Sequence, residues 1–250
     1  MISQPEILIL LRIITAHLLA DFLLQPEHWI HKKNIRGVRA PQLYYHVGIV
    51  GVLTYLFLAD WSNILLPLFI TGTHFAIDWW KSGRPQRARY FILDQMAHLL
   101  MILTGWIFYI GITTEAIQFI ESVFTSPPFW IILISYLAAT WPFGYLIAII
   151  TRRWQRELAS GDSQQLAGLQ NAGMWIGWTE RFIILTFILL EQYGAIGFLI
   201  AAKSIFRFSG KLDGNRERKE AEYILIGTLL SFALSIALGI GVAYLLEQWG

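Results

Sequence analysis

Cysteine is missing from this sequence, and charged residues are scarce. None of the 250 residues is a cysteine, which excludes a disulfide framework, a thiolate metal site and thiol chemistry. Charged residues make up 14% of the chain, whereas a soluble domain carries about a quarter. The net charge of +2 is too small to indicate a nucleic-acid partner. Hydrophobic residues reach 56% and aromatic residues 15%, so the composition predicts a membrane protein.

Apolar segments of nearly span length recur along the whole chain. A hydrocarbon core of about 30 Å needs roughly 20 apolar residues of helix, and long unbroken runs do not fit alternating barrel strands. We therefore predict an all-α, polytopic transmembrane helix bundle. The N-terminus lacks the basic region and the cleavage site of a signal peptide, so the first segment is expected to be a retained span. The eight expected spans are 6–25, 43–60, 63–81, 90–111, 129–150, 174–191, 193–208 and 222–246.

Lysine and arginine occur in alternate loops of this arrangement. The basic loops contain Lys32, Lys33, Arg36, Arg39, Lys81, Arg84, Arg87, Arg89, Arg152, Arg153, Arg156, Lys203, Arg207, Lys211, Arg216, Arg218 and Lys219. The opposite loops carry only acidic charges, and the positive-inside rule then places the basic loops in the cytoplasm and both termini outside. We expect two halves, 1–112 and 113–250, the second with a cytoplasmic segment at 152–173.

The first four spans carry ionisable residues at one common depth, near their cytoplasmic ends. These residues are His17, Asp21, His46, His74, Asp78, Asp94 and His98. Three His/Asp pairs are four residues apart, and such residues share one face of a helix. Imidazole and carboxylate are ligands of zinc, iron or manganese, so the pattern predicts a divalent-metal site. Asp21, Asp78 and Asp94 are the candidates for a catalytic role, and Gln25, Lys81 and Gln95 for outer hydrogen bonds or ligand binding. The alternative is a set of structural hydrogen bonds between helices.

The second half carries fewer polar groups. Those in its spans are Glu180, Arg181, Lys203, Arg207 and Glu222. They could pair as an interhelical lock, Glu180 with Lys203 or Arg207 and Arg181 with Glu222. Alternatively, Arg181, Lys203 and Arg207 could hold an anionic lipid headgroup or phosphate. Small residues recur at every fourth position of the last span, which favours close helix packing within the bundle or in a homo-oligomer. They include Gly227, Ser231, Ser235 and Gly239.

Several motifs in this order resemble a known family. The stretches HLLADFLLQ, HFAIDWWK and DQMAH, followed by IGWTERF, AAKSIFRF and AEYILIGTLLSF, are similar to bacterial membrane proteins of the domain-of-unknown-function 3307 (DUF3307) family. The first three stretches resemble the family itself, and the others resemble a segment that follows it in longer members. The resemblance implies a prokaryotic inner-membrane protein and no established activity.

Three functions are then in competition. The first is a metal-dependent membrane hydrolase that acts on a lipid or membrane-borne substrate from the cytoplasmic side, with one carboxylate as general base. The second is an ion- or proton-coupled transporter or channel, since buried histidines and carboxylates also form proton relays. The third is a non-catalytic scaffold whose cytoplasmic loops bind a partner. The polar residues lie in one leaflet only, which favours the first.

Overall fold

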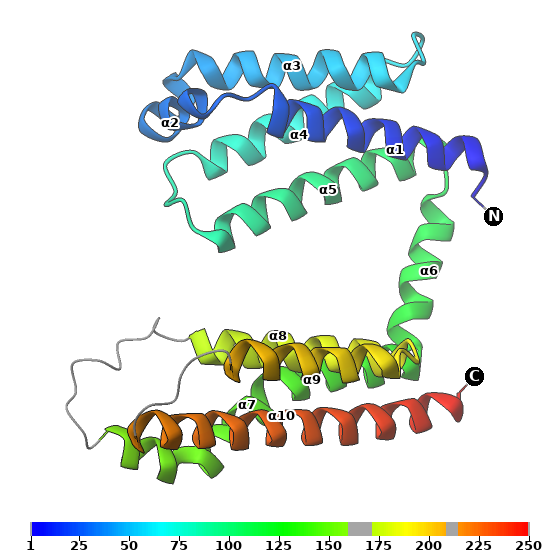
Figure 1. Cartoon of the computed structure of the whole chain (residues 1–250). Coiled ribbons are helices and arrows are strands. Elements are labelled where there is room, and N and C mark those ends of the chain that lie inside the picture. The colour runs from blue at the N-terminus through cyan, green and yellow to red at the C-terminus, as the bar shows by residue number, and fades with distance from the viewer. Residues whose placement is uncertain (1, 160–171, 209–214, 250) are drawn as a thin grey trace. The chain divides into compact units, whose positions relative to one another are not determined.

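The chain is helical throughout the part that its computed structural model describes. That part comprises residues 2–159, 172–208 and 215–249, except for the side chains of 158–159, 205–208, 215–218 and 220. It contains helices and no strand, which confirms the all-α prediction. The chain divides into two compact units, Met1–Ile120 and Glu121–Gly250, where the sequence predicted a boundary at 112/113. Each unit is described by itself (Figure 1).

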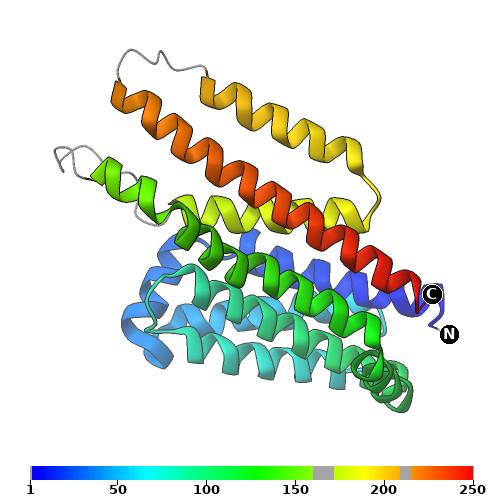
Figure 2. The same cartoon turned by 90° about the horizontal axis from the view of Figure 1, so that it is seen from below.

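The first unit is a bundle of four long helices with a short helix at one end. Its elements are α1 (Gln4–Leu18), the π-helical turn η1 (Leu19–Leu23), α2 (Glu27–Arg36), the 3₁₀ turn η2 (Gly37–Arg39), α3 (Pro41–Leu58), α4 (Leu65–Lys81) and α5 (Ala88–Ile110), followed by α6 (Thr113–Thr125) at the boundary between the units. Helix α1 packs on α3 and α5, and α4 also packs on both (Figures 1 and 2). All four therefore surround one common interior.

Local sequence explains several helix ends in this unit. Pro41 opens α3 at its first turn, where its fixed φ suits the helix and its missing N–H is not needed. Gly111 ends α5 with a φ of 76°, a conformation that glycine adopts without steric cost. In the turn between α3 and α4, Asp60 accepts hydrogen bonds from Ser62 Oγ at 2.6 Å and Tyr109 Oη at 2.8 Å. These bonds hold the pKa of the Asp60 carboxyl below its ordinary value.

Every predicted span coincides with a helix, and two further helices, α2 and α6, were not predicted. Within the described residues, four helices are long and apolar enough to cross a membrane, namely α5, Pro127–Glu157, α8 (Ala172–Leu189) and Ala221–Glu247. The bent pair of Gln4–Leu23 and Glu27–Arg39, which meet at 84°, would make a fifth. Of the other predicted spans, α3 and α4 have 18 and 17 residues, at the lower end of the range of about 17–25 for a span. Helix α9 (Tyr193–Phe208), with 16 residues, lies just below it.

The first unit buries its ionisable side chains and exposes large apolar ones. On α5, the buried side chains include Asp94 and His98, whereas Phe91, Met96 and Leu100 are about half exposed or more. A soluble protein rarely exposes such a continuous apolar surface, while a lipid bilayer requires it and confines ionisable groups to the bundle interior. The distribution is therefore compatible with a membrane protein.

The second unit contains α7 (Pro127–Ala159), α8, α9 and α10 (Asn215–Glu247). Helix α10 packs on both α7 and α8. A Cβ atom on Gly239 of α10 would lie 2.5 Å from Ile188 Cδ1 of α8, and Ser235 is fully buried. The small-residue stripe thus allows close packing within this unit, the first of its two predicted uses.

Candidate metal centre

Four histidines form one layer across the interior of the first unit. They are His17 of α1, His46 of α3, His74 of α4 and His98 of α5, all with 2% exposure or less. Four residues away on each helix, toward one side, lies an apolar layer of Ile13, Val50, Ile70 and Ile102. Four residues away toward the other side lies a polar layer of Asp21, Gln42, Asp78 and Asp94. Because a spacing of four residues keeps one helix face and advances about 6 Å, each helix contributes to every layer.

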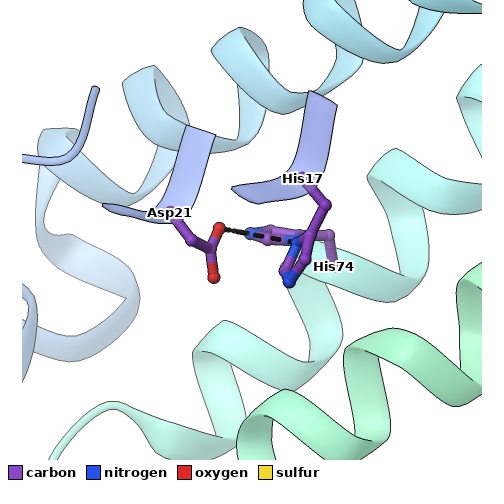
Figure 3. Close-up of side chains that lie close together, drawn as sticks. All are labelled: His17, Asp21 and His74. Carbon is purple, nitrogen blue, oxygen red and sulfur yellow. Dashed lines mark ion pairs between the residues drawn. The ribbon is translucent and has the colours of Figure 1, made fainter. Parts of the chain in front are cut away.

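Three imidazoles converge on one carboxylate oxygen, Asp21 Oδ1. His46 Nε2 is 3.3 Å from it, His74 Nε2 is 3.5 Å and His17 Nδ1 is 3.7 Å. Figure 3 shows His17 and His74 beside Asp21. The Nε2 atoms of His46 and His74 are themselves 2.9 Å apart. Three imidazole nitrogens, one from each of three helices, therefore lie within 3.7 Å of this oxygen.

Gln95 determines which ring nitrogen of a neutral His17 carries the proton. Its Nε2 donates to Asp21 Oδ2 at 3.3 Å and Asp94 Oδ2 at 3.1 Å, because carboxylates only accept. Its Oε1, 3.3 Å from His17 Nε2, must then accept from that nitrogen. His17 Nδ1 is consequently unprotonated and faces Asp21 Oδ1, also an acceptor. Neither atom has a hydrogen-bond partner among the described residues, so a cation between them would satisfy both.

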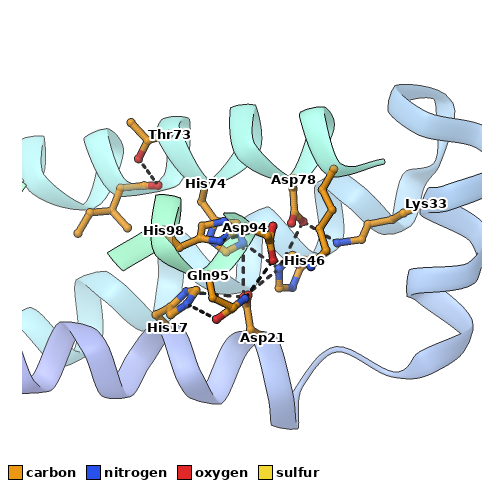
Figure 4. A network of polar contacts seen from close by, with 12 residues as sticks. His17, Asp21, Lys33, His46, Thr73, His74, Asp78, Asp94, Gln95 and His98 are labelled. Carbon is orange, nitrogen blue, oxygen red and sulfur yellow. Dashed lines mark hydrogen bonds and ion pairs between the residues drawn. The ribbon is translucent and has the colours of Figure 1, made fainter. Parts of the chain in front are cut away.

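Two lysines neutralise two of the three aspartates. Lys33 Nζ lies 2.5 Å from Asp78 Oδ2, and both residues are buried. Lys81 pairs with Asp94 Oδ2. Figure 4 shows Lys33 beside Asp78, and Asp94 among the histidines. With neutral imidazoles, the cluster carries three negative and two positive charges, a net −1 that remains on Asp21. A buried charge needs compensation, and a divalent cation beside Asp21 would provide it.

The backbone between α1 and α3 gives the site its shape. The turn η1 is π-helical, with the N–H of Leu24 donating to the C=O of Leu19 at 2.9 Å, and such turns occur often at functional sites. Asp21 lies within it. The chain then bends before α2, and α2 packs on α3, which brings Lys33 to Asp78.

The structure brings together all seven predicted ligand candidates. They fall into three overlapping groups whose ligand atoms lie within 4.8 Å of one another: His17, Asp21 and His74; His46, His74 and Asp78; and Asp78, Asp94 and His98. Lys81 and Gln95 contact them as predicted, whereas the buried Nε2 of Gln25 has no hydrogen-bond partner among the described residues.

Sequence analysis missed Lys33 and Gln42 as parts of the site. Lys33 was assigned only to a basic loop, although Trp29 and Ile30, one turn earlier, mark a helix face that could turn inward. Gln42 lies four residues before His46, the same spacing that links the other histidines to the acidic layer.

In the second unit, Lys203 Nζ lies 2.5 Å from Glu180 Oε1, which confirms one predicted pair. Arg181 does not pair with Glu222. It donates instead to the C=O groups of Ala139 and Thr140 and to Ser231 Oγ. The side chain of Arg207 and residues 160–171 of the predicted segment 152–173 lie outside the described part.

Comparison with known proteins adds one finding. Residues 8–126 match the family model described as protein of unknown function (DUF3307). Searches of curated proteins and of solved structures found no match. The matched region contains every residue of the His/Asp cluster and both lysines. The match confirms, for residues 8–126, the family resemblance predicted from the sequence motifs.

Proposed function

We propose that the first unit binds one divalent metal ion and that the protein is a metal-dependent membrane hydrolase. The substrate would be a lipid or another membrane-borne molecule, reached from the cytoplasmic side. The observation that supports this best is the convergence of three imidazoles on the uncompensated carboxylate of Asp21.

The spacing of these atoms suits a tetrahedral ion. Zinc binds nitrogen and oxygen at about 2.0–2.2 Å, which separates tetrahedral ligand atoms by roughly 3.3–3.6 Å. The distances among Asp21 Oδ1, His46 Nε2 and His74 Nε2 are 2.9–3.5 Å. His17 Nδ1, 3.7 Å from Asp21 Oδ1, would be a further ligand, so that binding of water or a substrate oxygen would make the ion five-coordinate. Iron and manganese accept the same ligand types, and one ion suffices because lysines already balance Asp78 and Asp94.

The remaining groups have roles that hydrolysis needs. A divalent ion held by these residues would supply a Lewis acid that polarises an ester or phosphoryl oxygen and lowers the pKa of water. Asp94 has one oxygen held by Lys81 and the other, Oδ1, buried without a hydrogen-bond partner among the described residues. That carboxylate could take a proton from water as general base, and Asp78, held by Lys33, is the alternative. Lys81 is 34% exposed and could hold an anionic substrate group at the edge of the site.

The proposed membrane arrangement retains eight spans with the N-terminus outside, in the inner membrane of a bacterium. The exposed apolar helix faces and the alternation of basic and acidic loops support it. In this arrangement the acidic layer lies toward the cytoplasm and the apolar layer toward the membrane centre.

Metal content tests the proposal directly. Protein purified in detergent is analysed by inductively coupled plasma mass spectrometry, with His46→Gln as the site variant and His31→Gln, exposed on α2, as the matched histidine control. Wild type and control should carry about one equivalent of zinc, iron or manganese per chain, and His46→Gln should carry almost none. No bound metal in wild type after supplementation with zinc and manganese would refute the metal centre.

Hydrolysis is tested separately. Wild type in vesicles of phosphatidylethanolamine and phosphatidylglycerol should release lipid products, detected by mass spectrometry, that a chelator abolishes. Bound metal without turnover would favour the second candidate, cation- or proton-coupled transport. The rings of His74 and His98, whose centroids are 4.1 Å apart, could pass a proton between them. The apolar layer beneath the histidines argues against a continuous polar path, and uptake into sealed vesicles would decide. A scaffold role predicts neither metal nor turnover.

A further inference from the structure

The second unit contains a cavity that the proposed metal centre does not use. Its volume is about 840 Å³, and residues of α7, α8, α9 and α10 line it. Cavities of roughly 300–1,000 Å³ are typical of small-molecule sites. The lining residues lie at the helix ends that continue into the predicted basic loops, so the cavity belongs to the proposed cytoplasmic leaflet.

Arg181 of α8 forms the polar wall of this cavity. The residue is only 3% exposed. Nε donates to Ala139 C=O, Nη2 donates to Thr140 C=O at 3.0 Å and Nη1 donates to Ser231 Oγ at 3.4 Å. A guanidinium has five N–H groups, so one on each Nη has no partner among the described residues. These two groups can donate to an oxyanion.

The charge of Arg181 is not balanced by the groups around it. The other charged side chains of the cavity wall are Glu180 and Lys203, which pair at 2.5 Å and cancel one another. Arg181 has no carboxylate within ion-pair distance among the described side chains. A buried, unpaired guanidinium favours an anionic ligand.

Glycines provide the room around this guanidinium. A Cβ atom on Gly144 of α7 would lie 2.9 Å from Arg181 Nη2, and one on Gly177 of α8 would lie 2.9 Å from Nη1. Both positions line the cavity. Trp141 and Tyr145 also line it and are 58% and 72% exposed. The wall thus combines one cationic group with aromatic surface that can contact acyl chains.

We propose that this cavity binds a phosphate-type anion, the headgroup of an anionic phospholipid, with Arg181 as its donor and the aromatic wall beside its chains. Free phosphate has the same headgroup chemistry and is distinguished by the test. The site is independent of the metal centre, because all of its residues lie in the second unit.

Native mass spectrometry of the full chain in detergent can measure this binding. The probes are phosphatidylglycerol, phosphatidylcholine and inorganic phosphate, titrated separately. Arg181→Gln removes the charge, and Gly227→Leu fills the cavity from α10, where a Cβ atom meets nothing within 4 Å. Gly241→Leu, equally open but outside the cavity wall, is the matched control. Metal content should be unchanged in all three.

Wild type and Gly241→Leu should bind phosphatidylglycerol at least about tenfold more tightly than phosphatidylcholine. Arg181→Gln should lose about tenfold or more in affinity, the usual effect of losing a charge-assisted hydrogen bond. Gly227→Leu should lose about as much, because its side chain fills the cavity. Phosphate binding with the same variant dependence and no lipid preference would identify the free anion as the ligand. Failure of wild type to bind any probe, or binding unchanged in both site variants, would overturn the proposal. If Arg181→Gln does not fold, Gly227→Leu against Gly241→Leu decides alone.

Discussion

Replacing Lys33 by methionine isolates the contribution of the buried ion pair that covers the metal centre. Lys33 Nζ lies 2.5 Å from Asp78 Oδ2, and the two side chains are 7% and 5% exposed. The substitution keeps most of the apolar volume but leaves Asp78 as an unpaired buried carboxylate. Breaking such a pair by removing one partner costs about 3–5 kcal/mol. Lys33→Met should therefore lower the free energy of unfolding of the metal-free protein by that amount.

Neighbouring Lys32 provides the control, because it is exposed on the same helix. Lys32→Met should change the free energy of unfolding by less than about 1 kcal/mol. Adding Asp78→Asn to Lys33→Met removes the unpaired charge and should restore part of the loss, so the double-mutant cycle should give an interaction energy of about 1–3 kcal/mol. The measurement is denaturant unfolding in detergent micelles, followed by circular dichroism.

Metal then tests the link between the ion pair and the site. Zinc at about 100 times its dissociation constant stabilises a folded protein by about 2.7 kcal/mol, and its charge would replace that of Lys33. Zinc should stabilise Lys33→Met at least as strongly as wild type. The reasoning is refuted if Lys33→Met is no less stable than Lys32→Met, or if the effects of Lys33→Met and Asp78→Asn simply add.

Three further predictions concern pH and packing. Metal occupancy should fall as the pH is lowered, because protons compete with the metal for imidazole and carboxylate ligands, and metal analysis after dialysis at each pH will show it. Asp60→Asn should destabilise the protein at neutral pH, because a carboxyl with a lowered pKa stabilises the fold above its ordinary pKa. The difference from wild type should vanish as the pH falls through the folded-state pKa. Unfolding midpoints measured across acidic pH will show this. Gly239→Leu should cost about 1–3 kcal/mol by forcing α10 away from α8, whereas Gly241→Leu should cost less than about 0.5 kcal/mol in the same unfolding assay.

Much of the fold could be predicted because long apolar segments mark the positions of the long helices. Apolar length alone located every long helix, from α1 to α10. Helices α2 and α6 were missed for different reasons. Helix α2 is polar apart from Trp29, Ile30 and Ile35, so it resembles a loop in hydropathy. Helix α6 (Thr113–Thr125) is too short, and too mixed in polarity, to count as a span.

The residues of the site could be predicted, but the charge of each aspartate and the protonation of each histidine could not. Spacing and depth placed all seven His/Asp residues in one region, because six of them lie on regular α-helices and Asp21 lies in the π-helical turn that continues α1. Which aspartate keeps its charge depends on Lys33, whose position follows from a bend and a helix that the hydropathy pattern does not reveal. The protonation of His17 likewise depends on Gln95, which lies on a helix far away in sequence and contacts the other ring nitrogen, Nε2.

The π-helical turn at Leu19–Leu23 makes the length of this segment as important as its composition. Such a turn contains one residue more than the α-helical turn it replaces. Deleting Leu19 or Ala20 would allow an ordinary α-turn with all its hydrogen bonds, yet Asp21 would then follow His17 by three residues instead of four, a change of about 100° around the helix axis. The Asp21 carboxylate would then point away from the three imidazoles. Substitutions at the apolar positions here should be mild, whereas a single deletion should dismantle the site within a helix that remains intact.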